Sequence, residues 1–373
     1  MSKEPIATIE DEEVEYYSLD NLLKEDAVYN LVVGERSNGK TYASLKYGLE
    51  HYIKTGKQVA IIRRWKEDIT GRRATAIWNG IESNNVVSEL TGGDFEGIYY
   101  YGGRYYLCTY EDGKAIWNEE DLFCYVFALS DTEHNKGITY PEIGTIIFDE
   151  FITKGTYLVD EFVLFMNTIS SIVRKRTDVK ILMLGNTVNR FNPYFKEMGL
   201  HHAQEQVQGT IDLYKYGESG LSVALEYASS SASRDINNFY FAFDNPKLEM
   251  ITSGAWELDM YPHSPMKFKP RDIMYYYFII FNDSIYQCEI VSVGDVTFTF
   301  IHEKTTPIKD PDNDLIYTFE YVPRLNYNRN LFKPINKLQQ RVMWYHVNDR
   351  VYYQDNSVGD AVNNYIKMCR SSL

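Results

Sequence analysis

The feature that most constrains the fold is an apolar run near the N-terminus that leads into a glycine-rich loop and then a helical pattern. The run YNLVV covers residues 29–33 and GERSNGKT covers 34–41, after which YASLKYGLEHYIKTG carries apolar residues at helical spacing up to Gly56. The short apolar run is typical of a buried parallel strand, and Gly56 is suited to a helix C-cap. Because QVAIIRRW supplies another strand at 58–65, the sequence predicts an α/β sheet with crossover helices.

The loop GERSNGKT matches the pattern G-x-x-x-x-G-K-[ST], in the strand–loop–helix context that this pattern requires. Glycines allow backbone N–H groups to turn inward around phosphates, and the N-terminus of the following helix adds its positive end. Lys40 would reach the β- and γ-phosphates of ATP, and the Thr41 hydroxyl would bind Mg²⁺. The predicted nucleotide-binding residues are Gly34, Glu35, Arg36, Ser37, Asn38, Gly39, Lys40 and Thr41.

Two further apolar stretches end in polar residues that belong at the same edge of such a sheet. TIIFDE ends in Asp149 and Glu150, and VKILMLGN ends in Asn186. Ligands of open α/β sheets bind at the carboxyl ends of the strands. Asp149 would therefore bind Mg²⁺, Glu150 would activate the attacking water, and Asn186 would contact the γ-phosphate or that water. A turn asparagine that only ends a strand stays open as the alternative for Asn186.

Arginines supply two candidates for stabilising charge as the γ-phosphate leaves. Arg174 opens the run RKR at the end of a predicted helix over 157–173, where basic residues also suit the helix dipole. In the sharper interpretation, Arg174 reaches the ATP of a neighbouring subunit. Arg36, inside the loop, is the second candidate.

The remaining patterns predict the domain organisation. Residues 67–140 contain glycine turns between short aromatic runs, which indicates an insertion with β-hairpins and then a return strand. From about residue 270 the pattern is that of an antiparallel meander followed by two helices. We predict an acidic flexible arm at 1–15, a P-loop ATPase domain at 16–205, a linker or hinge at 206–255 and a smaller α+β domain at 256–373.

Composition bears on the partners and the compartment. The net charge of −14 argues against a nucleic-acid partner, but residues 1–26, with nine acids and two lysines, hold half of that excess. Residues 54–73 are locally basic. A protein that encircles DNA in a ring needs a basic channel and not a basic exterior, so the acidic net charge does not exclude DNA.

No apolar run is long enough for a membrane span, and the N-terminus lacks the apolar segment of a secretory signal. The scattered cysteines favour a reducing cytoplasm over a zinc or disulfide framework: Cys108, Cys124, Cys288 and Cys369.

Four stretches together resemble the genome-packaging ATPases of small tailed phages of the phi29 type. They are YNLVVGERSNGKTYA, KTGKQVAIIRRWK, GTIIFDEF and VRKRTDVKILMLGNTVNRFNPYF, in one order over about residues 16–200. The segments RRWK and NPYF are not general ATPase features. The combination is therefore more specific than a phosphate loop alone.

The resemblance implies a P-loop ATPase of the additional-strand, catalytic-glutamate class, assembled as a homopentameric ring, with a linker subdomain and an RNase H-like C-terminal domain. It implies that ATP and Mg²⁺ drive double-stranded DNA through the portal into a viral prohead, in the host cytoplasm during virion assembly. A packaging RNA is a further partner of some relatives. Lys66, with Arg63 and Arg64, would face DNA or a neighbouring subunit.

We expect the RNase H-like domain to lack nuclease activity. A two-metal nuclease of this class needs an acid on the first strand, and here that strand reads MYYYFIIF. Asp283 and Asp295 fall in hairpin turns, which explain them without a metal. The domain would instead grip DNA or dock on the portal.

Other functions stay open as alternatives. A phage helicase or recombination ATPase would explain the loop but not the ordered set of stretches. A P-loop kinase is less favoured, because the adjacent pair Asp149–Glu150 suits hydrolysis by water. A binding module with a degenerate loop is disfavoured by the intact Lys40 and Thr41.

Overall fold

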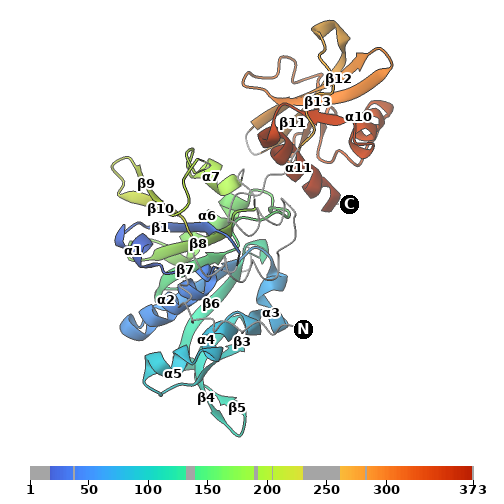
Figure 1. Ribbon diagram of the computed structural model, residues 1–373. Helices are drawn as coiled ribbons and strands as arrows, with labels where there is room; N and C mark the ends of the chain where they lie inside the picture. Colours follow the sequence, from blue (N-terminus) through green and yellow to red (C-terminus); the bar gives the residue numbers. More distant parts are fainter. Residues whose placement is uncertain are drawn as a thin grey trace, which may run out of the picture.

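The computed structural model describes residues 17–36, 38–131, 139–188, 192–203, 205–229, 261–281 and 284–371. Figure 1 shows two lobes, each built on its own β-sheet. We call residues 17–229 the N-terminal lobe and residues 261–371 the C-terminal lobe. The predicted acidic arm and much of the predicted linker lie outside the described residues.

The N-terminal lobe is organised by a large sheet. Its strands are β1 Tyr29–Gly34, β2 Gln58–Arg63, β3 Gly97–Tyr101, β4 Arg104–Glu111, β5 Lys114–Ile116, β6 Leu122–Ala128, β7 Ile143–Asp149, β8 Lys180–Asn186, β9 Ile211–Tyr216 and β10 Leu221–Tyr227. The order is β3-β4-β6-β2-β7-β8-β1-β10-β9, with β5 paired to β4. The stretch from β6 to β10 along this order is parallel, which confirms the predicted α/β class.

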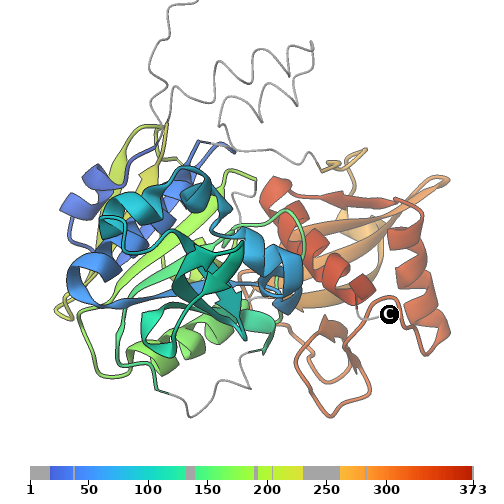
Figure 2. The ribbon, with the colours of Figure 1, turned by 90° about the horizontal axis from the view of Figure 1, so that it is seen from below.

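Helices cover both faces of this sheet (Figure 2). They are α1 Asp20–Lys24, α2 Lys40–Thr55, α3 Gly71–Ala76, α4 Asn79–Ser83, α5 Val86–Thr91, α6 Glu161–Val173 and α7 Pro193–Glu197, with short 3₁₀ turns at Lys66–Ile69 and Glu119–Asp121. Alternation along β1 divides the core: Leu31 and Val33 pack with α6 and α7, whereas Val32 packs with α2, α4 and α5. Helix α2 ends at Thr55 and is capped by Gly56, whose φ of +72° confirms the predicted C-cap.

One sequence prediction in this lobe is wrong, and another is incomplete. The predicted boundary at residue 205 fails because β10 pairs in parallel with β1, so the large sheet continues through Tyr227. The insertion contains the predicted hairpins, β3–β4 and β4–β5, but also the helices α3, α4 and α5, which the prediction did not include. Strand β6 does return to the sheet beside β2, as predicted.

The C-terminal lobe carries a smaller mixed sheet. Its elements are a 3₁₀ turn at Pro270–Asp272, β11 Ile273–Phe281, β12 Ser284–Val293, β13 Val296–Glu303, β14 Leu315–Thr318, β15 Tyr327–Asn328, α10 Lys337–Val347, β16 Val351–Tyr353 and α11 Asn356–Ser371. The order is β15-β14-β11-β12-β13-β16, with the predicted antiparallel meander β11–β12–β13 at its centre. Both predicted helices, α10 and α11, pack on this sheet through buried residues such as Val342 and Val362.

Hydrogen bonds join the two lobes near the carboxyl edge of the large sheet. Lys367 on α11 donates from Nζ to the carbonyl of Lys154 over 2.8 Å. Lys196 on α7 donates from Nζ to Oγ of Ser284 over 3.3 Å. The C-terminal lobe therefore contacts the loop that follows β7.

Two whole-chain properties bear on the sequence predictions. All four cysteines are buried and free. Across the described residues, no helix combines the length and the apolar character that a membrane crossing requires.

Candidate functional site

The predicted nucleotide-binding residues meet because three neighbouring strands end at one edge of the large sheet. Strands β7, β8 and β1 are adjacent, and their register places Gly34 beside Asn186 and Asp149 beside Leu184. The glycine-rich loop, Asp149 and Asn186 thus come from segments far apart in the sequence. Their predicted placement at one edge is confirmed, while their chemical roles stay predictions.

The loop between β1 and α2 depends on glycine at both ends. Gly39 precedes α2 with a φ of +94°, a left-handed conformation that glycine adopts without strain. At Gly34, a Cβ would lie only 3.0 Å from the carbonyl oxygen of Ala228 and 3.1 Å from Nδ2 of Asn38. The loop backbone is therefore shaped as the phosphate-loop pattern requires. Ser37, one of its predicted residues, lies outside the described residues.

Lys40 is held at the centre of the loop. Its buried ammonium donates to the carbonyls of Gly34 at 3.3 Å and Glu35 at 2.6 Å. It also reaches side-chain oxygens of Asn38 at 3.0 Å and Asn186 at 3.3 Å. Burial lowers the pKa of Lys40 to about 8, although the negative charges of Asp149 and Glu35 oppose that shift.

Oxygen atoms suited to a hard cation lie beside this ammonium. The Thr41 hydroxyl donates to the two carboxylate oxygens of Asp149 over 3.3 and 3.4 Å. Arg63, at the end of β2, forms an ion pair with Asp149 over 2.7 Å and a longer one with Glu150 over 3.3 Å. Arg63 therefore bridges the last residue of β7 and the acid that follows it.

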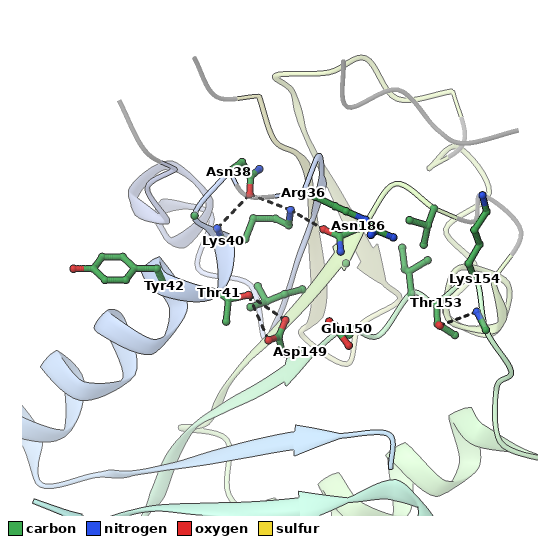
Figure 3. Close-up of a pocket in the computed structure, with 16 residues that line it drawn as sticks. Arg36, Asn38, Lys40, Thr41, Tyr42, Asp149, Glu150, Thr153, Lys154 and Asn186 are labelled. Atoms are coloured by element: carbon green, nitrogen blue, oxygen red, sulfur yellow. Dashed lines mark hydrogen bonds between the residues drawn. The ribbon is translucent and has the colours of Figure 1, made fainter. Parts of the chain in front are cut away.

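Residues of the loop, the end of β7 and the end of β8 line a cavity of about 580 Å³. Figure 3 shows Lys40, Thr41, Asp149, Glu150 and Asn186 around the same opening, with Thr153 and Lys154 on its far side. The residues fit a magnesium nucleotide: the loop offers backbone N–H groups and an ammonium, and Thr41 and Asp149 offer hard oxygen ligands. Within the described part of the chain, the buried amide nitrogen Nδ2 of Asn38 has no hydrogen-bond partner, which leaves a donor available in the loop.

Glu150 occupies an unusual backbone position. Its φ is +62°, a left-handed value that non-glycine residues adopt only when their surroundings impose it. Its side chain is 64% exposed and lies at the cavity. Water can therefore reach the Glu150 carboxylate, and neighbouring residues must hold the backbone of Glu150 in its left-handed conformation.

The two arginine candidates lie in different places. Arg36 is exposed and lines the cavity within its own chain. Arg174 follows α6 with a φ of +51° and lines a separate hollow with Tyr140 and Ser170. Among the described residues, the lining of the nucleotide cavity does not include Arg174. This placement is compatible with a role toward another subunit, which stays a prediction.

The three basic residues predicted to face DNA or a neighbouring subunit lie in different environments. Lys66 is 57% exposed and pairs with Asp131 over 2.8 Å. Arg64 is buried and bound to Glu161, so the prediction that it contacts DNA is wrong. Arg63 forms ion pairs with Asp149 and Glu150, so its charge is already engaged by those two acids.

Sequence reasoning also missed residues that the structure brings to the site. Glu161 is buried at the start of α6 and pairs with Arg64, whose guanidinium donates to the carbonyl of Glu150. Thr153, Lys154 and Gly155 line the cavity. An acid in the first turn of a helix looks like a favourable dipole contact, and nothing in its spacing identifies a partner 97 positions away.

In the C-terminal lobe, the structure describes one of the two acids considered for a nuclease. Asp295 is exposed in the turn between β12 and β13, and Asp283 lies outside the described residues. Glu289 on β12 is buried and contacts His302 over 3.4 Å. Within the described ranges, there is no group of three or more His, Cys, Asp or Glu side chains that could hold a metal.

Comparison with known proteins places this site in a family. Residues 11–216 match the sequence model of the family described as Podovirus DNA encapsidation protein (Gp16). The chain is 30% identical over 183 residues to the DNA packaging proteins of Bacillus phages PZA and phi29, in alignments that cover 48% of this chain and 49% of each relative. The chain thus spans about half the length of the curated relatives it matches.

The fold is similar to a solved structure over a longer range. The structure described as the Phi-28 gp11 DNA packaging motor aligns with a TM-score of 0.56 and 17% identity, covering 95% of this chain and 98% of that chain. At 17% sequence identity, this similarity shows that the two chains share a fold. The family match includes the loop, Asp149, Glu150 and Asn186, and it extends over more than half of the 373 residues. The chain therefore belongs to the Podovirus DNA encapsidation protein (Gp16) family.

Proposed function

We propose that this protein is an ATP-driven motor that moves double-stranded DNA into a viral prohead. The observation that carries the proposal is the joining of Lys40, Thr41 and Asp149 around one cavity, with Glu150 at its solvent side. Family membership supports the DNA substrate, because the matched relatives are named DNA packaging proteins. The helicase, recombination and kinase alternatives have no comparable support.

In this proposal, the chain's own residues bind and orient a magnesium nucleotide. Lys40 and the loop N–H groups would bind the phosphates, and Thr41 and Asp149 would hold Mg²⁺. The bound Mg²⁺ neutralises charge that develops on the phosphates. Glu150 would orient and polarise the attacking water, and Asn186, which already contacts Lys40, would sense the γ-phosphate.

The motor would work as a homopentameric ring on the portal of the prohead, in the host cytoplasm, with a packaging RNA as a further partner of some relatives. Arg174 would act on the nucleotide of a neighbouring subunit, and Arg36 on that of its own. Lys66 would contact DNA phosphates, so that binding depends on salt and little on sequence. We infer that the C-terminal lobe holds DNA or the portal without cutting, since β11 carries no acidic residue.

The experiment that tests the proposal is ATP hydrolysis by the purified protein across protein concentration, with and without double-stranded DNA. We expect activity per subunit to rise with protein concentration and with DNA. Glu150→Gln should bind ATP and lose turnover, whereas Lys40→Ala should lose binding. Activity that is indifferent to both concentration and DNA, in the presence of proheads as well as in their absence, would refute the motor.

A further inference from the structure

The loop after β7 is fastened by a buried ion pair that the sequence did not reveal. Arg64 and Glu161 are 5% and 2% exposed, and they meet in a two-pronged contact of 2.8 and 2.9 Å. Glu161 also accepts from the hydroxyl of Tyr194 over 2.7 Å and from the backbone N–H of Leu158 over 2.8 Å. The pair therefore joins the end of β2 to the starts of α6 and α7.

The remaining N–H groups of Arg64 are directed at the backbone of the predicted catalytic glutamate. Arg64 donates from Nη1 to the carbonyl oxygen of Glu150 over 3.1 Å and from Nη2 to that of Phe151 over 2.8 Å. The N–H of Phe151 donates to the carbonyl of Leu184 over 3.1 Å. The peptide group between Glu150 and Phe151 is thus held at both ends, its oxygen by Arg64 and its nitrogen by β8.

We propose that the Arg64–Glu161 pair holds Glu150 in the orientation from which it activates water, which makes both of them positioning residues for ATP hydrolysis. This inference rests on the proposed function. The left-handed φ of Glu150 has to be imposed by its surroundings, and Arg64 supplies the hydrogen bonds that impose it. Glu161 keeps the guanidinium in place, and it begins the helix whose far end carries Arg174.

Stability alone is a poor explanation for this arrangement. Taking two charges out of water is expensive, and well-packed apolar residues often replace a buried ion pair at no loss. What apolar residues cannot do is donate to two successive backbone carbonyls. The planar guanidinium of arginine can donate to the Glu161 carboxylate and to these carbonyls at once, which the ammonium of lysine cannot do in a fixed geometry. What the ion pair specifically provides is therefore a fixed backbone conformation at Glu150.

The test compares Glu161→Gln and Arg64→Lys with wild type in steady-state ATP hydrolysis with DNA and in equilibrium ATP binding. We expect kcat to fall roughly 100-fold, the effect of a small misplacement of a catalytic group, while KM and the dissociation constant of ATP stay within about twofold. The matched control is Thr145→Val, which removes the contact of buried Thr145 with His51 at the other end of β7 and should leave kcat unchanged.

A double-mutant cycle separates positioning from general damage. Because Arg64 and Glu161 act through Glu150, Glu161→Gln should reduce the residual hydrolysis of Glu150→Gln by less than about twofold. An equal loss in both backgrounds, or a rise in KM at constant kcat, would overturn the positioning role alone. Wild-type hydrolysis that is indifferent to DNA and to protein concentration, with and without proheads, would instead refute the proposed function.

A milder variant covers the case in which the charged pair cannot be altered without unfolding. Tyr194→Phe removes one hydrogen bond to Glu161 and retains the ring that packs on Phe148 and Phe165. We expect kcat to fall roughly fivefold at unchanged KM, the effect of one typical hydrogen bond. A folded Tyr194→Phe protein with wild-type kcat would overturn the inference.

Discussion

The hydroxyl of Thr41 donates to the carboxylate of Asp149 over 3.3 Å, across 108 positions of sequence. The contact joins the first turn of α2 to the last residue of β7, so both oxygens face one point in the cavity. Paired hydroxyl and carboxylate oxygens are ligands that Mg²⁺ prefers. The first prediction concerns this pair.

Thr41→Val should raise the Mg²⁺ concentration for half-maximal ATP hydrolysis, because it removes one oxygen and nearly preserves the shape of the side chain. The expected rise is roughly tenfold or more, as for other losses around metal sites. Thr41→Ser is the control, since it retains the hydroxyl and should stay near the wild-type value. An unchanged Mg²⁺ requirement in Thr41→Val would remove Thr41 from the metal site.

Much of this site could be predicted from the sequence, because it depends on local patterns. The run of residues 29–56 specifies a strand, a loop and a helix, and short apolar stretches ending in Asp149 and Asn186 specify strands whose ends must share an edge. The glycine at position 56 likewise caps α2 as predicted. These features need no knowledge of distant contacts.

What could not be predicted depends on pairing between distant segments. Strand β10 looked like part of a weakly patterned linker, and only its place beside β1 makes it a core strand. Arg64 looked like an exposed base beside Lys66, yet Glu161 offers a partner that carries it into the interior. Sequence periodicity shows which face a residue occupies, but not which element covers that face.

A second prediction follows from the ionisation of Lys40. Its pKa is lowered to about 8 by burial, so in the free protein the ammonium is charged below that pH and neutral above it. Because the charged form binds phosphate, kcat/KM for ATP should be level below pH 8 and fall about tenfold per pH unit well above it. The measurement is kcat/KM against pH at saturating Mg²⁺. A level profile up to pH 10 would contradict the assignment.

A third prediction concerns the stability of the C-terminal lobe. His346 is buried, accepts or donates one hydrogen bond of 2.7 Å with the Tyr277 hydroxyl, and has a pKa lowered to about 3 by burial and by Arg370. An unfolded chain binds a proton on this residue near pH 6.5, and the folded chain does not until about pH 3. The free energy of unfolding should therefore fall as pH drops through that window.

Denaturant unfolding at pH 7 and pH 5 checks this sign. The contribution of His346 at pH 5 should be a loss of about 2 kcal/mol, from about 1.4 kcal/mol per pH unit below the unfolded pKa. His346→Gln should lose that component of the pH dependence. His302→Gln is the control, because the pKa of His302 is raised by Glu289 and its contribution has the opposite sign. An identical pH dependence in His346→Gln and wild type would show that His346 is not buried in its neutral form.

The fourth prediction concerns Arg174, at the end of α6. It lies outside the lining of its own chain's nucleotide cavity, as far as the described residues show, so its effect on hydrolysis should require a neighbour. Mixing Arg174→Ala with Glu150→Gln, each inactive alone, should restore activity, because some sites then combine the intact Glu150 of one subunit with the intact Arg174 of its neighbour. Arg36→Ala, at the cavity within its own chain, is the control and should restore none when mixed with Glu150→Gln, because each site lacks one of the two residues. Failure of the Arg174→Ala mixture to regain activity would exclude action between subunits.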